Sequence, residues 1–103
     1  MHKTNIKDIV DYLSEGPYKK IFYDKGNLKI QIVCLKAGQK IPPCKMGNDV
    51  LFYVIDGNGE IIVDAEKDDL LPAVAVVVPK EAESRSISAR TDMIILAVQA
   101  KGK

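Results

Sequence analysis

The chain has 103 residues, 47% of them hydrophobic and 28% charged, which is typical of one globular domain with a single core. Fifteen basic and fourteen acidic residues are mixed along the chain and give a net charge of +1, so we expect no nucleic-acid partner. The longest apolar stretches, such as residues 50–55, are far too short to cross a membrane.

The first residues and the cysteine count bear on the compartment. Residues 1–8 lack the apolar segment and the small-residue cleavage site of a secretory signal, so we expect the protein in the cytoplasm. Cys34 and Cys44 are too few for a disulfide framework, and thiols are the expected state in a reducing compartment. Whether a single bridge joins them depends on their distance.

Residues 5–15 carry the pattern of a short amphipathic helix. Four apolar residues follow the i, i+3, i+4, i+7 spacing of one helix face: Ile6, Ile9, Val10 and Leu13. Thr4 or Asn5 can cap its start, and Gly16 with Pro17 ends it. We expect a helix over about 5–15 that packs its apolar face on the rest of the domain.

From residue 18 onward, short β-branched or aromatic runs alternate with turn residues. The expected strands cover residues 18–23, 28–36, 50–56, 60–65, 74–78, 85–89 and 93–100, with a further extended segment at 41–44. About eight or nine short strands at this spacing predict an all-β sandwich or barrel. The expected organisation is one domain over 1–103, with the barrel over about 18–100.

Several expected strands are continuous apolar runs, which predicts cover on both faces. Residues 50–55, 74–78 and 93–98 do not alternate between apolar and polar side chains, as a strand with one wet face should. The barrel interior covers one face, and one eleven-residue helix cannot cover the other face of three strands. We therefore expect a homodimer, the commonest symmetric assembly.

The stretch from Gly38 to Gly57 resembles the first conserved motif of the cupin superfamily. That motif runs Gly, five residues, His-x-His, three or four residues, Glu, six residues, Gly. The spacing fits without a gap, but Cys44 and Met46 stand where the two histidines would be, and Val50 stands at the glutamate position.

The second cupin motif also matches in spacing. It runs Gly, five residues, Pro-x-Gly, two residues, His, three residues, Asn. Pro79 is kept, while Ala73 and Glu81 replace the glycines, Ser84 replaces the histidine and Ser88 the asparagine. The resemblance, which spans roughly residues 28–100, implies a small antiparallel cupin barrel, also called a double-stranded β-helix or jelly roll, behind the short N-terminal helix.

In the family, three imidazoles and one carboxylate hold a divalent metal inside the barrel. No position of that site keeps its ligand here, and the only histidine, His2, precedes the expected helix. We therefore expect no metal and no other cofactor. Cys44 and Met46 form a soft pair that suits Cu(I), and a thiol beside a basic group can act as a nucleophile, but packing is the favoured role because both residues commonly fill apolar interiors.

The resemblance implies which side chains line the barrel cavity. The candidate ligand-binding residues, chosen by their shared inward parity, are Cys44, Met46, Val50, Phe52, Ser84, Ser86 and Ser88. Inward serines are favoured because the alternative, with Ile87 and Ala89 inside, turns Arg85 inward as well. Burying an unpaired guanidinium is costly. A one-residue slip would reverse every side chain.

Three functions fit these residues. The favoured one is a metal-free module that binds a small molecule or acts as an accessory protein, with no catalytic residue assigned. An enzyme of the isomerase, epimerase or dioxygenase type with a non-standard site is the second. A purely structural dimeric barrel, filled by side chains such as Met46 and Phe52, is the third.

Overall fold

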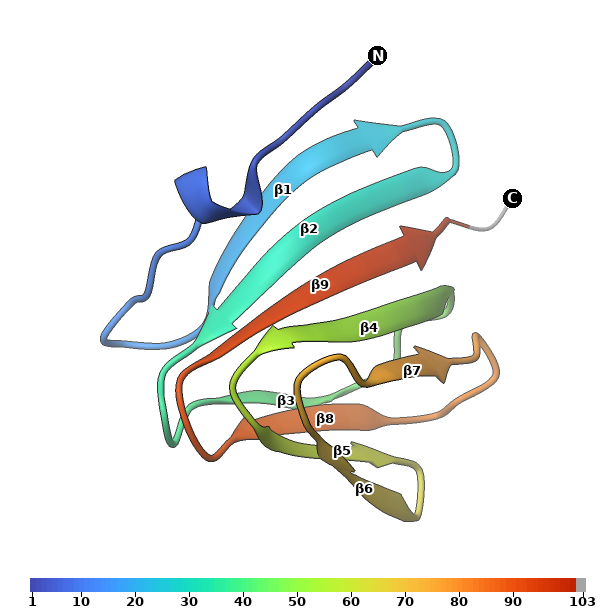
Figure 1. Cartoon of the computed structure of the whole chain (residues 1–103). Helices are drawn as coiled ribbons and strands as arrows, with labels where there is room; N and C mark the ends of the chain where they lie inside the picture. Colours follow the sequence, from blue (N-terminus) through green and yellow to red (C-terminus); the bar gives the residue numbers. More distant parts are fainter. Residues whose placement is uncertain (102–103) are drawn as a thin grey trace.

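The structure is a computed structural model that describes residues 1–101, which form two antiparallel sheets facing each other (Figure 1). The first sheet has the order β1-β2-β9-β4-β7 and the second β3-β8-β5-β6. The strands are β1 (Tyr18–Lys25), β2 (Leu28–Leu35), β3 (Lys40–Cys44), β4 (Asp49–Asp56), β5 (Gly59–Val63), β6 (Glu66–Leu70), β7 (Ala75–Val78), β8 (Arg85–Ala89) and β9 (Met93–Ala100). The all-β prediction is confirmed.

The core lies between the two sheets and is built from alternate residues of their strands. In the second sheet Ile87 of β8 pairs with Ile41 of β3 and with Ile61 of β5, so three isoleucines form one buried row across three strands. From the first sheet, Phe52 and Ile95 point into the same core. This cross-strand packing fixes which face of each strand is inside.

The turn between β4 and β5 depends on Gly57. Its φ is +82°, and a Cβ at this position would lie 2.0 Å from the carbonyl oxygen of Asp92. Only glycine allows the two segments to approach so closely. The second glycine of the first motif thus has a steric role in the fold.

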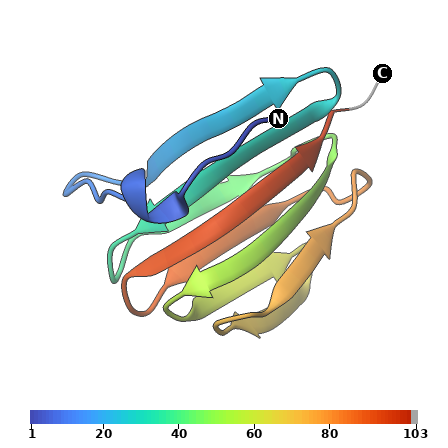
Figure 2. The same cartoon turned by 45° about the horizontal axis from the view of Figure 1, so that its top comes forward.

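The expected helix over residues 5–15 is wrong: the only helical element in the described residues is a 3₁₀ turn, η1 (Ile6–Asp8). The side chain of Asn5 caps it by accepting from the backbone N–H of Lys7, as one of the two predicted caps should. The residues before this turn lie over β1 and β2, and the segment beyond it runs irregularly to the start of β1 (Figure 2). Isolated short helices are only marginally stable, and the segment instead contacts the rest of the domain, for example through the hydrogen bond from Gln39 Nε2 in the β2–β3 turn to the carbonyl of Leu13.

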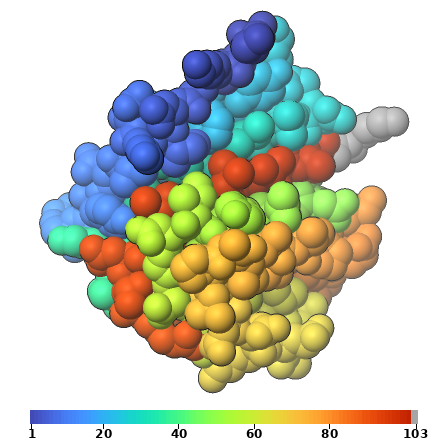
Figure 3. Space-filling view, viewed as in Figure 1, coloured from blue at the N-terminus to red at the C-terminus, as the bar shows by residue number. Residues whose placement is uncertain are grey.

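The N-terminal segment leaves part of the first sheet's outer face uncovered. Side chains of β9, β4 and β7 reach the surface there (Figure 3). The large apolar residues of this outer face include Leu51, Tyr53, Ile55, Val77, Ile94 and Leu96. Tyr53 is 37% exposed and Val77 is 65% exposed, which marks an apolar surface without cover from the chain itself.

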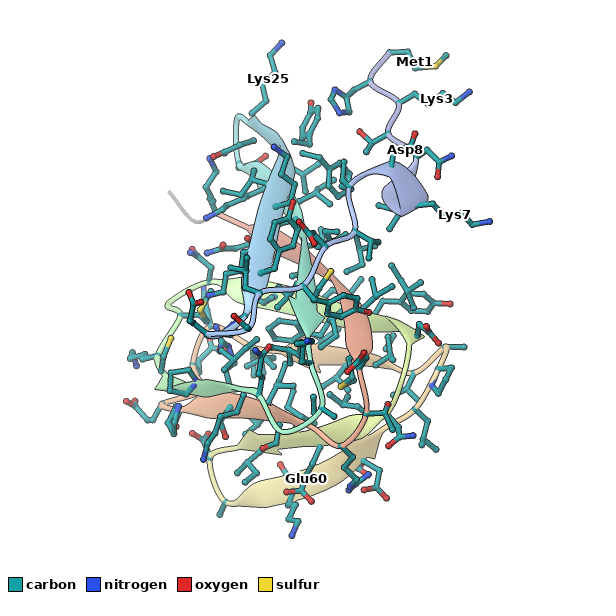
Figure 4. The ribbon with its side chains drawn as sticks, turned by 90° about the vertical axis from the view of Figure 1, so that its left-hand side faces the viewer. Met1, Lys3, Lys7, Asp8, Lys25 and Glu60 are labelled. Atoms are coloured by element: carbon teal, nitrogen blue, oxygen red, sulfur yellow. The ribbon has the colours of Figure 1, made fainter. Side chains whose placement is uncertain are left out.

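The outer face of the second sheet is polar. Glu60 of β5 accepts contacts from Lys67 of β6 and from Arg90, which also pairs with Asp69. Glu60 lies on the opposite side of the molecule from Met1 and the N-terminal turn (Figure 4). Within residues 1–101, no helix is long and apolar enough to cross a membrane.

Candidate functional site

One end of the barrel is formed by three connections, and we call this end the mouth. They are the β3–β4 connection (residues 45–48), the β5–β6 turn (64–65) and the β7–β8 loop (79–84). All three lie at the right-hand end of the barrel in Figure 1. β8 starts directly behind the last of these connections, so its first side chain is placed at the mouth.

Two carboxylates hold the β7–β8 loop in place. Asp49 Oδ1 accepts from the backbone N–H of Lys80 at 2.8 Å on one side. On the other side, Asp64 Oδ1 accepts from the N–H groups of Glu83 and Ser84 at 2.9 and 3.0 Å. Asp64 N–H also donates to the carbonyl of Ser84 at 2.9 Å. The backbone that leads into Arg85 is thereby fixed by β4 on one side and by the β5–β6 turn on the other.

Arg85 points into the barrel. Its side chain is only 6% exposed, and its Nη2 lies 2.8 Å from Met46 Sδ. The guanidinium carbon lies 5.5 Å from the centre of the Phe52 ring, which places a cation against the face or edge of an aromatic side chain. Nε and Nη1 are buried and have no hydrogen-bond partner among the described residues. The mouth therefore holds a positive charge whose donors are only partly satisfied.

The prediction that three serines line the interior is wrong. Ser84, Ser86 and Ser88 are half-buried on the outer face of the second sheet, and they alternate with buried Arg85, Ile87 and Ala89. Ser88 pairs in register with Glu60 and Lys40, which belong to the same outer face. The buried isoleucine row through Ile87 sets this parity, and the stability that it contributes outweighs the cost of turning Arg85 inward.

The remaining predicted cavity residues divide between the core and the surface. Val50 and Phe52 are buried in the core between the sheets. Met46 is half-buried and packs against the core, whereas Cys44 is exposed at the end of β3, with its Sγ 3.7 Å from Met46 Sδ. Cys44 is therefore not an interior residue. It lies at the rim because β3 ends there.

Both cysteines are free thiols, so the question of a bridge between them is answered. Cys34 lies on the outer side of β2, where residues of the N-terminal segment cover it. Burial raises the pKa of the Cys34 thiol. It behaves as a small apolar side chain.

A pocket of about 390 Å³ opens between the β5–β6 hairpin and β7. Its lining combines an apolar wall with a charged rim: the wall is Ile61, Val63, Val76, Val77, Pro79 and Ala82, and the rim is Asp64, Glu66, Lys67, Asp68 and Glu81. Val63 is the register partner of Arg85, and Val76 is the register partner of Phe52. Arg85 and Phe52 are therefore strand neighbours of the pocket wall, but neither lines the pocket.

Sequence reasoning missed Arg85, Val63 and Val76 as residues of the site. The parity of Ile87 and Ala89 was the available signal for Arg85, since both are apolar and share its face of the strand. The two valines belong to different sheets and come together only where the two sheets face each other. No local pattern brings β5 and β7 to the same pocket.

The residues at the family's metal positions do not fit a metal ion. Val50 offers only a hydrocarbon, Ser84 lies on the outer face, and Met46 Sδ is already in contact with the Arg85 guanidinium. A buried positive charge beside the sulfur opposes any cation, Cu(I) included. Within residues 1–101, no group of three or more His, Cys, Asp or Glu residues is placed to hold a metal.

Comparison with known proteins shows the fold. No model of a known protein family matches the sequence, and neither does any curated protein. Among solved structures, the TT1209 protein of Thermus thermophilus is similar at 21% identity, with a TM-score of 0.91 and 98% of each chain covered. An RmlC-like cupin protein of Desulfovibrio desulfuricans is similar at 23% identity, with a TM-score of 0.87, over 97% of this chain and 96% of that one.

An enzyme shares the same fold. Salicylate 1,2-dioxygenase of Pseudoaminobacter salicylatoxidans (a G106A mutant structure) is similar at 18% identity, with a TM-score of 0.78, over 92% of this chain and 29% of that one. The chain thus has the cupin fold that its motif spacing predicts. At these identities the similarity concerns the fold and not the chemistry of the site.

Proposed function

We propose that the protein is a metal-free binding module that takes a small organic molecule at the mouth of its barrel. The supporting observation is a pocket of about 390 Å³ whose apolar wall includes Val63 and Val76 and whose rim carries polar side chains such as Lys67. Apolar walls with a few fixed polar groups are the usual make-up of small-molecule sites. The deeper interior is packed by residues such as Ile87 and Met93, so the ligand binds at the mouth and not in the centre.

A titration of the labelled protein with three matched molecules tests this proposal. Benzoate, benzamide and benzylamine share one ring and differ in charge, and ¹H–¹⁵N spectra report which backbone amides respond to each. We expect at least one of them to shift the amides of Val63, Val76 and Ala82 in a saturable way. Shifts that are absent for all three, or spread over the surface, would contradict the proposal.

A matched pair of variants locates the response in the pocket. Val63→Phe puts a larger side chain into the pocket wall, whereas Ile62→Phe makes a similar change on the outer face of the same strand. Val63→Phe should weaken the saturable shifts, and Ile62→Phe should leave them unchanged. Equal responses of the two variants would place the binding elsewhere.

Elemental analysis of untagged protein prepared without chelator tests the metal-free part. We expect no stoichiometric transition metal, because the guanidinium occupies the side of Met46 that a metal would need. About one Zn, Fe, Mn or Ni ion per chain, lost in Cys44→Ala, would favour the enzyme instead.

A further inference from the structure

We propose that the molecule bound in the pocket between β6 and β7 is a small organic cation, with an ammonium group on an apolar ring or chain. This inference rests on the proposed binding function and adds the charge and the chemical class of the ligand. The apolar wall of the pocket holds the body of the ligand. The rim, which carries four carboxylates and one lysine, holds the ammonium group.

Two of the rim carboxylates come from the inner face of β6. Glu66 is the register partner of Val63, and Asp68 is the register partner of Ile61. Directly paired residues of antiparallel strands share a face of the sheet, and Ile61 is buried in the core, so both carboxylates lie on the core side of β6. Both are nevertheless exposed, because β6 and β7 are edge strands of different sheets and the pocket lies between them.

The rim is negative because its carboxylates have no cationic partner in the protein. Within residues 1–101, no ion pair involves the four rim carboxylates, which belong to Asp64, Glu66, Asp68 and Glu81. Lys67 directs its charge elsewhere, since it pairs in register with Ile62 on the outer face and its Nζ lies 3.4 Å from Glu60 Oε2. The pocket therefore attracts a positive charge.

The buried charge of Arg85 does not cancel that of the rim. Arg85 does not line the pocket, and its Nη2 contacts Met46 Sδ at 2.8 Å. Met46 follows β3, which lies on the other side of β8 from β5 and β6. The side chains that a ligand in the pocket meets are thus the carboxylates and the apolar wall.

The placement of the carboxylates favours an organic cation over a metal ion. Within residues 1–101, no group of three or more His, Cys, Asp or Glu residues is placed to hold a metal. An ammonium group needs no fixed coordination shell, because its three N–H donors rotate toward the acceptors that are near. Val63 and Val76 are half-buried, so an apolar body on the same molecule gains free energy by covering them.

Benzylamine, benzamide and benzoate test the sign of the charge at pH 7. The saturable shifts of the Val63 and Val76 amides should rank the three affinities in that order. Benzylamine should bind at least about fivefold more tightly than benzamide, as expected for one close pair of opposite charges in water. Raising NaCl from about 50 mM to about 500 mM should remove most of this preference, because salt screens exposed charges.

Asp68→Asn and Asp69→Asn are matched variants, because each removes one negative charge from an exposed position of β6. Asp68 lines the pocket, whereas Asp69 pairs with Arg90 on the outer face. Asp68→Asn should weaken benzylamine by about threefold and leave benzamide unchanged, and Asp69→Asn should change neither affinity. A protein that carries both Glu66→Gln and Asp68→Asn should lose most of the preference for benzylamine.

The outcomes separate this inference from the proposed function. Equal binding of benzylamine and benzamide, tighter binding of benzoate, or equal effects of Asp68→Asn and Asp69→Asn would overturn the assignment of a cation and leave a binding module in place. The inward carboxylates of β6 would then serve to prevent edge-to-edge association of this strand. If none of the three molecules shifts the amides of the pocket, the proposed function fails as well.

Discussion

Arg85 is the residue whose replacement most directly tests the physical reasoning about this barrel. Arg85→Met keeps a flexible side chain of similar reach and removes the charge and all five N–H donors. The change loses the contact with Met46 and the contact with the Phe52 ring, worth together up to about 3 kcal/mol. It also removes three buried, unpaired N–H groups, each of which costs about 1–3 kcal/mol.

The second effect is the larger, so Arg85→Met should stabilise the fold. We expect a gain of about 1–4 kcal/mol in the free energy of unfolding, as seen when buried charges are replaced by apolar side chains. In a domain of this size each kcal/mol corresponds to about 4–8 °C in Tm. Urea denaturation and calorimetry at one fixed protein concentration measure it, since any dimerisation makes stability depend on concentration.

Arg90→Met is the matched control, because it removes an arginine from an exposed ion pair, which is worth about 0–1 kcal/mol. A loss of stability above about 1 kcal/mol in Arg85→Met would refute the reasoning. It would mean that the guanidinium stabilises the free protein. A gain in stability is the expected result, because the unpaired donors of Arg85 cost more free energy than its two contacts contribute.

Three further predictions follow from the fold. Gly57→Ala should destabilise the protein by several kcal/mol more than Gly38→Ala, because both glycines have positive φ but, of the two, only Gly57 has backbone atoms where a Cβ would lie. Urea unfolding of the two variants compares the losses, and equal losses would contradict the steric explanation. In the native protein Cys44 should react with a thiol reagent such as DTNB while buried Cys34 does not, and a native Cys44→Ser protein that still reacts rapidly would refute this. We propose that a second copy of the chain covers the exposed apolar face around Tyr53. Light scattering should then give about twice the monomer mass of 11.3 kDa, and Tyr53→Lys should shift the measured mass toward that of the monomer. A wild-type mass near 11.3 kDa at micromolar concentration would rule the dimer out.

Local sequence signals predicted the strands and turns. Gly26 and Asn27 between two apolar runs predicted the β1–β2 hairpin, and the proline and glycine spacing predicted the barrel. These signals hold because turn geometry and strand alternation depend on neighbouring residues. The N-terminal helix had a comparable local pattern and failed, because a helix this short gains less from its own hydrogen bonds than from contacts with β2.

Two local signals in β8 point to opposite faces, and tertiary structure decided between them. Apolar Ile87 and Ala89 favour the face that proved to be inside, whereas the cost of burying the charge of Arg85 favoured the other one. Pairing with Ile41 and Ile61 on the neighbouring strands decides the parity, and these residues are far away in the chain. The candidate site follows from that parity, because it brings a guanidinium from β8 into contact with a sulfur from the β3–β4 connection and a ring from β4. Contacts between residues so distant in sequence are set by the packing of the two sheets, which no local pattern encodes.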